Sequence, residues 1–308
     1  MKSIEWRGQG LSKLCLGTVQ FGLSYGVSNK NGQTSLTESK EILDFVFSEG
    51  VNCLDTAQSY GDSEKVLGKY FSATNVEEKF IISKISSSKF VNGYSQVYDS
   101  VQESIERLNI PNLFAVLLHD SDLLGRWEER DGQIVSQLKA AGKIEYFGVS
   151  IYNEEEYSKA VDNPEIDLIQ VPFNLFDHRA LKNHWFDRAQ SSNKLIIVRS
   201  VFLQGLLLMQ KETLPSHLKS AGRYLKILDE ICNRLDWSRQ ELALNYVDSF
   251  APNSLLLFGC EFLDQAKENI ALFSNLKPVS AKIWEQMDTA LSEINEHIYN
   301  PILWGQNV

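Results

Sequence analysis

Residues 113–119 read LFAVLLH, and this stretch decides the fold because it is apolar from its first residue to its sixth. A strand with one face in water alternates apolar and polar side chains, whereas a strand covered on both faces is apolar throughout. Residues 195–198, which read LIIV, have the same character. Both stretches therefore predict a parallel sheet covered by helices.

Similar short apolar runs recur along the chain, separated by segments with helical spacing. Eight such units, with a typical period of about 30 residues, predict an α/β fold of the closed (β/α)8 TIM-barrel type. The predicted strands are Leu14–Thr18, Val51–Asp55, Phe80–Lys84, Leu113–His119, Glu145–Ser150, Ile166–Val171, Leu195–Ser200 and Ser254–Gly259. The predicted helices between them are Ser35–Glu49, Ser63–Phe71, Tyr94–Leu108, Glu129–Ala141, Glu154–Val161, His184–Ser191 and Phe262–Phe273. A doubly wound sheet is the alternative, but no strand is followed by the G-x-G-x-x-G turn of a dinucleotide-binding fold.

Three segments lie outside this regular pattern. Residues 1–13 are predicted to form a hairpin that plugs one end of the barrel. The long interval from Ser200 to Ser254 is predicted to hold a loop and the helices Tyr224–Leu235 and Ser238–Phe250. Residues 279–308 are predicted to form a helix, Ala281–His297, and an irregular tail with Trp304. We expect a single domain over residues 1–308.

Composition narrows the range of functions. The 308 residues carry a net charge of −10, which disfavours a broad surface for nucleic acid or anionic membrane because both require surplus Lys and Arg. The four cysteines are not spaced like a metal site, so no metal is expected and a reducing, cytoplasmic setting is the simplest inference. No apolar stretch approaches the ~20 residues that cross a bilayer. The expected partner is a small molecule, and the oligomeric state stays open.

Three consecutive predicted strands end in polar groups. VNCLD presents Asp55, FIISK presents Lys84 and LFAVLLH presents His119, while Tyr60 follows Asp55 by five residues. Each residue alone is more often a cap, a solvated end or a buried structural group than a catalyst. Barrel enzymes place their working groups at the carboxyl ends of the strands, so we expect these four side chains to converge at one rim.

Such a group suits proton donation to a carbonyl. A free phenol has a pKa near ~10 and is a reluctant acid. The ammonium of Lys84 is expected to lower the pKa of Tyr60, with Asp55 holding Lys84 in its charged form. His119 is expected to hydrogen-bond and polarise the carbonyl oxygen.

Several motifs resemble the aldo-keto reductase superfamily, in particular its bacterial NAD(P)H-dependent members. They are LGTVQFG (16–22), NCLDTAQSYGDSEKVLG (52–68), FIISK (80–84), LLHD (117–120), AAGKIEYFGVS (140–150), IQVPFN (169–174) and SVFLQGLLL (200–208). The match runs from about residue 11 to residue 275, and its D-T-A-x-x-Y-G-x-S-E pattern is highly specific. The resemblance implies a (β/α)8 barrel that binds a nicotinamide cofactor without a dinucleotide-binding fold. It also implies the catalytic tetrad Asp55, Tyr60, Lys84 and His119, with Tyr60 as proton donor.

The resemblance also implies a set of cofactor contacts. They are Gly17, Thr18, Ser150, Gln170, Arg199, Ser200, Phe202, Gln204, Gly205, Gly259, Gln265, Glu268 and Asn269. The chain departs from the family at Ile151, where Asn is common, so one contact is missing or is supplied by Asn153. It departs again at Arg199, where an aromatic side chain often stacks on the nicotinamide. The segment GCEFLDQAKEN (259–269) has Glu261 and Gln265 where NADPH-selective relatives carry Lys or Arg, so NADPH is preferred only slightly and NADH is possible.

The expected activity is hydride transfer from the cofactor to an aldehyde or ketone, with a sugar-type carbonyl as the candidate substrate. The residues expected at the pocket mouth are Val19, Phe21, Tyr25, Trp127, Tyr152, Phe173 and Phe202. Two alternatives are a sugar dehydrogenase running the reverse reaction and a non-catalytic, cofactor-binding redox sensor or regulatory subunit. A third, an aldolase that uses Lys84 as a Schiff base, is disfavoured because Asp55 would keep that lysine charged.

Overall fold

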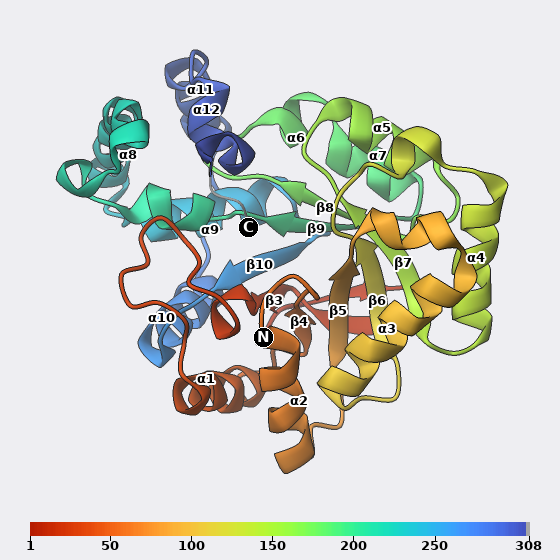
Figure 1. The fold of residues 1–308 in the computed structure, drawn as a ribbon. Coiled ribbons are helices and arrows are strands. Elements are labelled where there is room, and N and C mark those ends of the chain that lie inside the picture. The colour runs from red at the N-terminus through yellow and green to blue at the C-terminus, as the bar shows by residue number, and fades with distance from the viewer. Residues whose placement is uncertain (306–308) are drawn as a thin grey trace.

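A computed structural model describes residues 1–305 and confirms the predicted barrel. Eight parallel strands close on themselves in the order β10-β3-β4-β5-β6-β7-β8-β9, and helices surround them (Figure 1). The barrel strands are β3 (Leu14–Gly17), β4 (Cys53–Asp55), β5 (Phe80–Ile85), β6 (Leu113–Leu118), β7 (Ile144–Ser150), β8 (Leu168–Pro172), β9 (Leu195–Arg199) and β10 (Leu255–Gly259).

The predicted N-terminal hairpin is present. Its strands β1 (Ser3–Trp6) and β2 (Gln9–Ser12) pair in antiparallel fashion. Trp6 and Leu11 are buried in the same cluster as the residues inside the barrel, so the hairpin closes that end. Asp167 fixes the hairpin there, because it accepts a hydrogen bond from the Arg7 guanidinium at 2.5 Å and is also paired with Lys139.

The helices begin close to where capping residues predict them. Ser35 caps the first helix through the Glu38 N–H, and Ser238 forms a capping box with Glu241. The helices are α1 (Leu36–Ser48), α2 (Ser63–Ala73), α3 (Tyr94–Leu108), α4 (Glu129–Ala140), α5 (Glu154–Asp162), α6 (Arg179–Lys182), α7 (Trp185–Ser191), α8 (Gly222–Leu235), α9 (Arg239–Phe250) and α10 (Leu263–Ser274).

The C-terminal segment differs from the sequence expectation. The predicted helix Ala281–His297 is broken into α11 (Ala281–Ala290) and α12 (Glu296–Tyr299). The break has a local cause, because the Asn295 side chain accepts the His297 N–H and starts a new helix. Both helices lie with α8 at one side of the barrel (Figure 1). No helix within residues 1–305 is long and apolar enough to cross a membrane.

Side-chain alternation along the strands positions the polar groups. One buried cluster consists of hairpin and strand residues without helix residues, and it therefore fills the inside of the barrel. Its members include Cys53, Ile82, Leu117, Leu168 and Ile197. Side chains two positions apart along a strand share a face. The residues two positions further along, Asp55, Lys84, His119, Gln170 and Arg199, thus follow the interior layer at its carboxyl end.

Candidate active site

A pocket of about 1080 Å³ opens at the carboxyl ends of the barrel strands. Asp55, Tyr60, Lys84 and His119 all line it, as the sequence predicts. The pocket extends from these four residues to the beginning of α10. Among residues 1–305, no group of three or more His, Cys, Asp or Glu side chains is arranged to hold a metal ion.

Asp55 and Lys84 form a buried ion pair. The Lys84 ammonium lies 2.5 Å from Asp55 Oδ1, and the two side chains are only 1% and 3% exposed. The other carboxylate oxygen, Oδ2, accepts a hydrogen bond from Gln170 Nε2 at 2.9 Å. Lys84 also donates to the Thr56 carbonyl at 3.1 Å. Both carboxylate oxygens are therefore used, and the lysine is held in one orientation.

A tight turn carries Tyr60 over this pair. The Lys84 ammonium lies 3.3 Å from Tyr60 Oη and 4.8 Å from the centre of its ring. The turn packs against Gly22, where a Cβ would lie only 1.7 Å from the Tyr60 carbonyl oxygen. Gly61 follows with φ +54°, a conformation that glycine adopts without strain. The two glycines let the backbone approach closely enough to place the phenol beside the lysine.

The pKa of Tyr60 is raised in the structure, in contrast to the sequence expectation. Burial opposes the phenolate, the charge of Asp55 raises the pKa further, and the charge of Arg199 opposes the rise. The expectation considered only the ammonium of Lys84, whose charge Asp55 offsets at 2.5 Å. Tyr60 therefore keeps its proton in the free protein, and a strongly basic acceptor is needed to remove it.

His119 is neutral above mildly acidic pH. Burial, together with the smaller effects of the Lys84 and Arg199 charges, lowers its pKa to about 4. Its ring meets the Tyr60 ring edge to face, with 5.6 Å between centroids and an angle of 85°. Ser59 Oγ lies 3.0 Å from His119 Nδ1. When the hydroxyl donates to Nδ1, the ring proton is on Nε2, where it is available to a ligand oxygen.

The structure brings together all the positions that the resemblance assigned to the cofactor. Each of them lines the pocket: Gly17, Thr18, Ser150, Gln170, Arg199, Ser200, Phe202, Gln204, Gly205, Gly259, Gln265, Glu268 and Asn269. Several pocket-lining side chains also have a buried polar atom with no hydrogen-bond partner, namely Gln20, Asp120, Arg199 and Gln204. Unpaired buried polar atoms are costly, so these atoms fit a pocket that takes a polar ligand such as a dinucleotide.

Two details at this end of the barrel differ from expectation. Asn153 does not supply the contact missing at Ile151, because its side chain caps α5 through the Glu156 N–H. Arg199 stacks on Tyr152, with its guanidinium carbon 4.0 Å from the ring centre. Tyr152 thus places an aromatic ring beside position 199, where relatives often carry an aromatic side chain of their own.

The segment after β9 crosses the pocket as a strap. Ser200, Leu203, Gln204 and Gly205 have positive φ, and the Gln204 carbonyl accepts the Val27 N–H at 3.1 Å. This hydrogen bond joins the strap to the loop after β3, so the strap passes over the end of β10, which lies between β9 and β3. This course would let residues 200–207 fold over a ligand bound in the pocket.

The end of the pocket near α10 has negative rather than positive character. Glu261 and Glu268 line it. Glu38 accepts the Leu263 N–H at 2.6 Å, and Gln265 accepts the Glu261 N–H at 2.6 Å. Side chains of the protein thus already occupy backbone amides that a phosphate could use.

The predicted substrate-side residues fall into two groups. Val19, Tyr25, Tyr152 and Phe202 line the pocket with the tetrad. Phe21 and Phe173 are fully buried and lie beneath its surface. Their positions follow from packing: for example, the Phe173 ring lies 5.0 Å from that of Tyr246 in the core.

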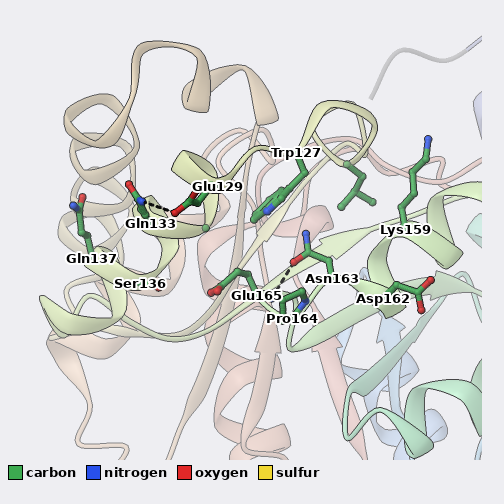
Figure 2. Close-up of a pocket in the computed structure, with 12 residues that line it drawn as sticks. Trp127, Glu129, Gln133, Ser136, Gln137, Lys159, Asp162, Asn163, Pro164 and Glu165 are labelled. Atoms are coloured by element: carbon green, nitrogen blue, oxygen red, sulfur yellow. Dashed lines mark hydrogen bonds between the residues drawn. The ribbon is translucent and has the colours of Figure 1, made fainter.

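Trp127 lies in a different place from the one expected. It lines a second, shallow pocket of about 760 Å³ on the outside of the barrel, between α4 and α5 (Figure 2). The reason is that Trp127 comes just before α4 and packs against Phe147, with 6.2 Å between ring centroids. Glu129, Gln133 and Lys159 lie around it.

Sequence reasoning missed several residues that line the main pocket. Lys89 lies in the segment after β5, and Glu156 lies in the first turn of α5 after β7. Pro301 and Ile302 come from the C-terminal tail, more than 30 residues after β10 ends at Gly259. Loop residues after each predicted strand were a usable signal for the first two, whereas the tail residues carried none.

Comparison with known proteins agrees with this fold. The profile of the Aldo/keto reductase family matches residues 13–292. An L-galactose dehydrogenase of Arabidopsis thaliana is 26% identical, with 98% of this chain and 96% of that protein aligned. An aldo-keto reductase of Bacillus subtilis is 24% identical over 90% of this chain and 85% of its own length. Among solved structures, an aldo-keto reductase of Bacillus halodurans in its holo form has a TM-score of 0.76 at 21% identity and covers 97% of this chain and 99% of that one.

Proposed function

The chain belongs to the aldo/keto reductase family, and from this premise we propose that it reduces an aldehyde or ketone with a nicotinamide cofactor, using Tyr60 as the proton donor. The observation that carries the proposal is the meeting of Tyr60 with the Asp55–Lys84 pair and His119 in one pocket. A non-catalytic sensor would need the pocket but not a phenol held beside an ammonium.

The raised pKa of Tyr60 is compatible with this role. A nicotinamide bound here would supply a hydride to the carbonyl carbon, which would leave an alkoxide-like oxygen. Such an oxygen is more basic than a phenolate, so Tyr60 can protonate it although burial makes the phenol a weak acid. The Lys84 ammonium at 3.3 Å then stabilises the phenolate that remains.

His119 is proposed to orient the carbonyl. It is neutral at physiological pH, and Ser59 at 3.0 Å from Nδ1 favours a proton on Nε2. A neutral imidazole donor polarises the carbonyl without competing with Tyr60 for the role of acid.

The cofactor is proposed to be NADH in preference to NADPH, which reverses the slight preference drawn from the sequence. The supporting observation is the acidic α10 end of the pocket, with Glu261 and Glu268 in its lining. The nearby cation Lys267 lies 3.4 Å from Asp264, so its charge is partly offset. A 2′-phosphate placed here would meet like charge.

Exchanging one residue tests this preference. Gln265→Arg frees the Glu261 N–H that Gln265 accepts at 2.6 Å and adds a guanidinium. We expect the ratio of kcat/KM for NADPH to that for NADH to rise by about tenfold or more, measured in steady-state assays with both cofactors. An unchanged ratio would place the 2′-phosphate elsewhere.

A polyhydroxylated carbonyl, such as a sugar, is the proposed substrate class. Ser59, Ser86 and Ser121 line the tetrad end of the pocket and offer hydrogen bonds to hydroxyl groups. The relative named L-galactose dehydrogenase supports this class and also favours the reverse reaction, oxidation of a sugar, as a second candidate.

The central experiment compares the wild-type protein with Tyr60→Phe. Both are assayed for oxidation of NADH and NADPH with 4-nitrobenzaldehyde and a panel of aldoses, and for reduction of NAD⁺ with the same sugars. We expect Tyr60→Phe to lower kcat by at least ~100-fold while the Kd for the cofactor stays nearly constant. Near-normal kcat in the variant would remove Tyr60 from the role, and cofactor binding without turnover in the wild type would favour the sensor.

A further inference from the structure

We infer that Arg199 makes the pocket distinguish between the two oxidation states of the nicotinamide, holding the reduced form more tightly than the oxidised form. The inference rests on the proposed function, because it assumes that a nicotinamide binds in this pocket. It concerns a residue of this chain at a position where the resemblance leads one to expect an aromatic side chain, and it assigns that residue an electrostatic role.

The place of Arg199 follows from strand register. Ser150 pairs with Gln170 across β7 and β8, and Pro172 pairs with Arg199 across β8 and β9. Gln170 in turn is bonded to Asp55 of the tetrad. Arg199 therefore ends its strand on the rim that carries the catalytic group, and it lines the same pocket.

The reactive ring must lie at this end of the pocket. Proton and hydride are delivered to the two atoms of one carbonyl group, so the hydride donor must bind close to Tyr60 Oη. The charge of Arg199 reaches this region. Burial raises the pKa of Tyr60 and the Arg199 charge opposes it, while burial lowers the pKa of His119 and the charges of Lys84 and Arg199 lower it further.

Three contacts hold the guanidinium in place. Nη2 donates to the Ile151 carbonyl at 3.0 Å, Nη1 donates to Ser200 Oγ at 3.3 Å, and the plane lies against the Tyr152 ring at 4.0 Å. Nε is buried and has no partner. A charge that is fixed and partly withdrawn from water acts more strongly on a neighbour than a mobile, solvated one.

No carboxylate neutralises Arg199 within ion-pair distance in the part of the chain that the structure describes. Three of the acids that line the pocket near the tetrad have other partners. Asp55 pairs with Lys84, Glu156 accepts the Tyr152 N–H, and Asp120 accepts the Ser87 N–H. Arg199 thus has no direct ion-pair partner, although the carboxylates of Asp120, Asp122 and Glu156 also line the pocket.

This charge separates the two oxidation states. The oxidised nicotinamide ring carries a positive charge that the reduced ring lacks, while the phosphates and riboses are the same in both. Arg199 therefore repels only the oxidised ring, while the contacts to the phosphates and riboses cancel when the two affinities are compared. When both forms compete, the pocket fills with the reduced form, which is the form that carbonyl reduction requires. By thermodynamic linkage, tighter binding of the reduced form makes the bound cofactor a weaker hydride donor, by the same factor as the ratio of the two dissociation constants.

The test measures the ratio of two dissociation constants. NADH and NAD⁺ are titrated into the full chain by isothermal calorimetry, and Kd(NAD⁺)/Kd(NADH) is compared between the wild type and Arg199→Gln. We expect the ratio to fall by at least about tenfold, which corresponds to ~1.4 kcal/mol. Arg199→Lys should keep most of the ratio, because it keeps the charge.

Two further variants make the result specific. Arg199→Met is a second neutral replacement that still packs on Tyr152, and it should lower the ratio as Arg199→Gln does. Lys267→Gln removes a positive charge on α10, far from the tetrad, and should change both constants by the same factor. An unchanged ratio in the neutral Arg199 variants overturns the inference while leaving the proposed function intact. Failure of the wild type to bind either cofactor overturns both.

Discussion

Replacing Asp55 with Asn tests the arrangement at the centre of the pocket. Asp55 accepts from two donors at once, the Lys84 ammonium at 2.5 Å on Oδ1 and Gln170 Nε2 at 2.9 Å on Oδ2. Asparagine has nearly the same shape but only one acceptor oxygen, and its amide would point N–H groups at whichever donor the oxygen does not face. The substitution therefore leaves either a buried ammonium or a buried amide opposed by another donor.

The magnitude follows from burial. The side chains of Lys84 and Asp55 are 1% and 3% exposed, so water cannot solvate the ammonium that loses its partner. Removing one member of a buried pair costs about 3–5 kcal/mol, a large part of the ~5–15 kcal/mol that stabilises a typical folded protein. We expect Asp55→Asn to lower the free energy of unfolding by this amount.

Urea unfolding followed by tryptophan fluorescence and circular dichroism measures the effect. The double variant Asp55→Asn with Lys84→Met should be less destabilised than the sum of the two single changes, because no unpaired charge remains. Glu155→Gln, which makes the same chemical change in the exposed pair Glu155–Lys159, should leave the unfolding midpoint nearly unchanged. A loss below ~1 kcal/mol for Asp55→Asn, with an unchanged m-value, would refute the buried pair.

Two other properties follow from the same geometry. Gly22→Ala places a Cβ 1.7 Å from the Tyr60 carbonyl oxygen, so it should lower the free energy of unfolding in urea by about 1–3 kcal/mol. The same clash should displace Tyr60 and lower kcat. Gly125→Ala, whose Cβ would have no neighbour closer than 3.8 Å, is the matched control. Because burial lowers the pKa of His119 to about 4, kcat/KM for carbonyl reduction should not depend on this group between pH ~5 and 8 and should fall as the pH approaches 4. The same shift makes the free energy of unfolding depend on pH. Between the folded pKa of about 4 and the unfolded pKa of ~6.5, the unfolded chain binds more protons than the folded one. The contribution of His119 to stability is therefore complete above pH ~6.5 and is lost as the pH falls towards 4. A titration step near the ordinary histidine pKa that His119→Asn abolishes would contradict this placement.

The sequence predicted the part of the site that depends on strands. Apolar runs mark buried parallel strands, and the residue that ends each run must lie at the shared carboxyl edge. Asp55, Lys84 and His119 could therefore be placed together from local patterns. Motif resemblance added Ser150, Gln170 and the positions near α10, all of which line the same pocket.

The parts that could not be predicted depend on contacts between distant segments. Glu38 caps the Leu263 N–H across 225 residues, and no local pattern near either residue announces that contact. Trp127 looked like a mouth residue because it follows β6, but packing against Phe147 directs it to the outside. The pKa of Tyr60 went the opposite way from expectation because its largest cause is burial, a property of the folded chain alone.

Strand register is the physical reason that Asp55 and Lys84 meet. Asp55 pairs with Ile82, and the chain beyond β4 continues this ladder, with the Thr56 N–H bonded to the Ile82 carbonyl and the Gln58 N–H to that of Lys84. Lys84 lies two residues after Ile82 and thus shares its face, towards the barrel interior. A slip of one residue between β4 and β5 would turn Lys84 outwards and leave the Asp55 carboxylate buried without its cation. The ion pair and the register therefore stabilise each other, because the buried carboxylate is tolerated only in the one register that brings the ammonium to it.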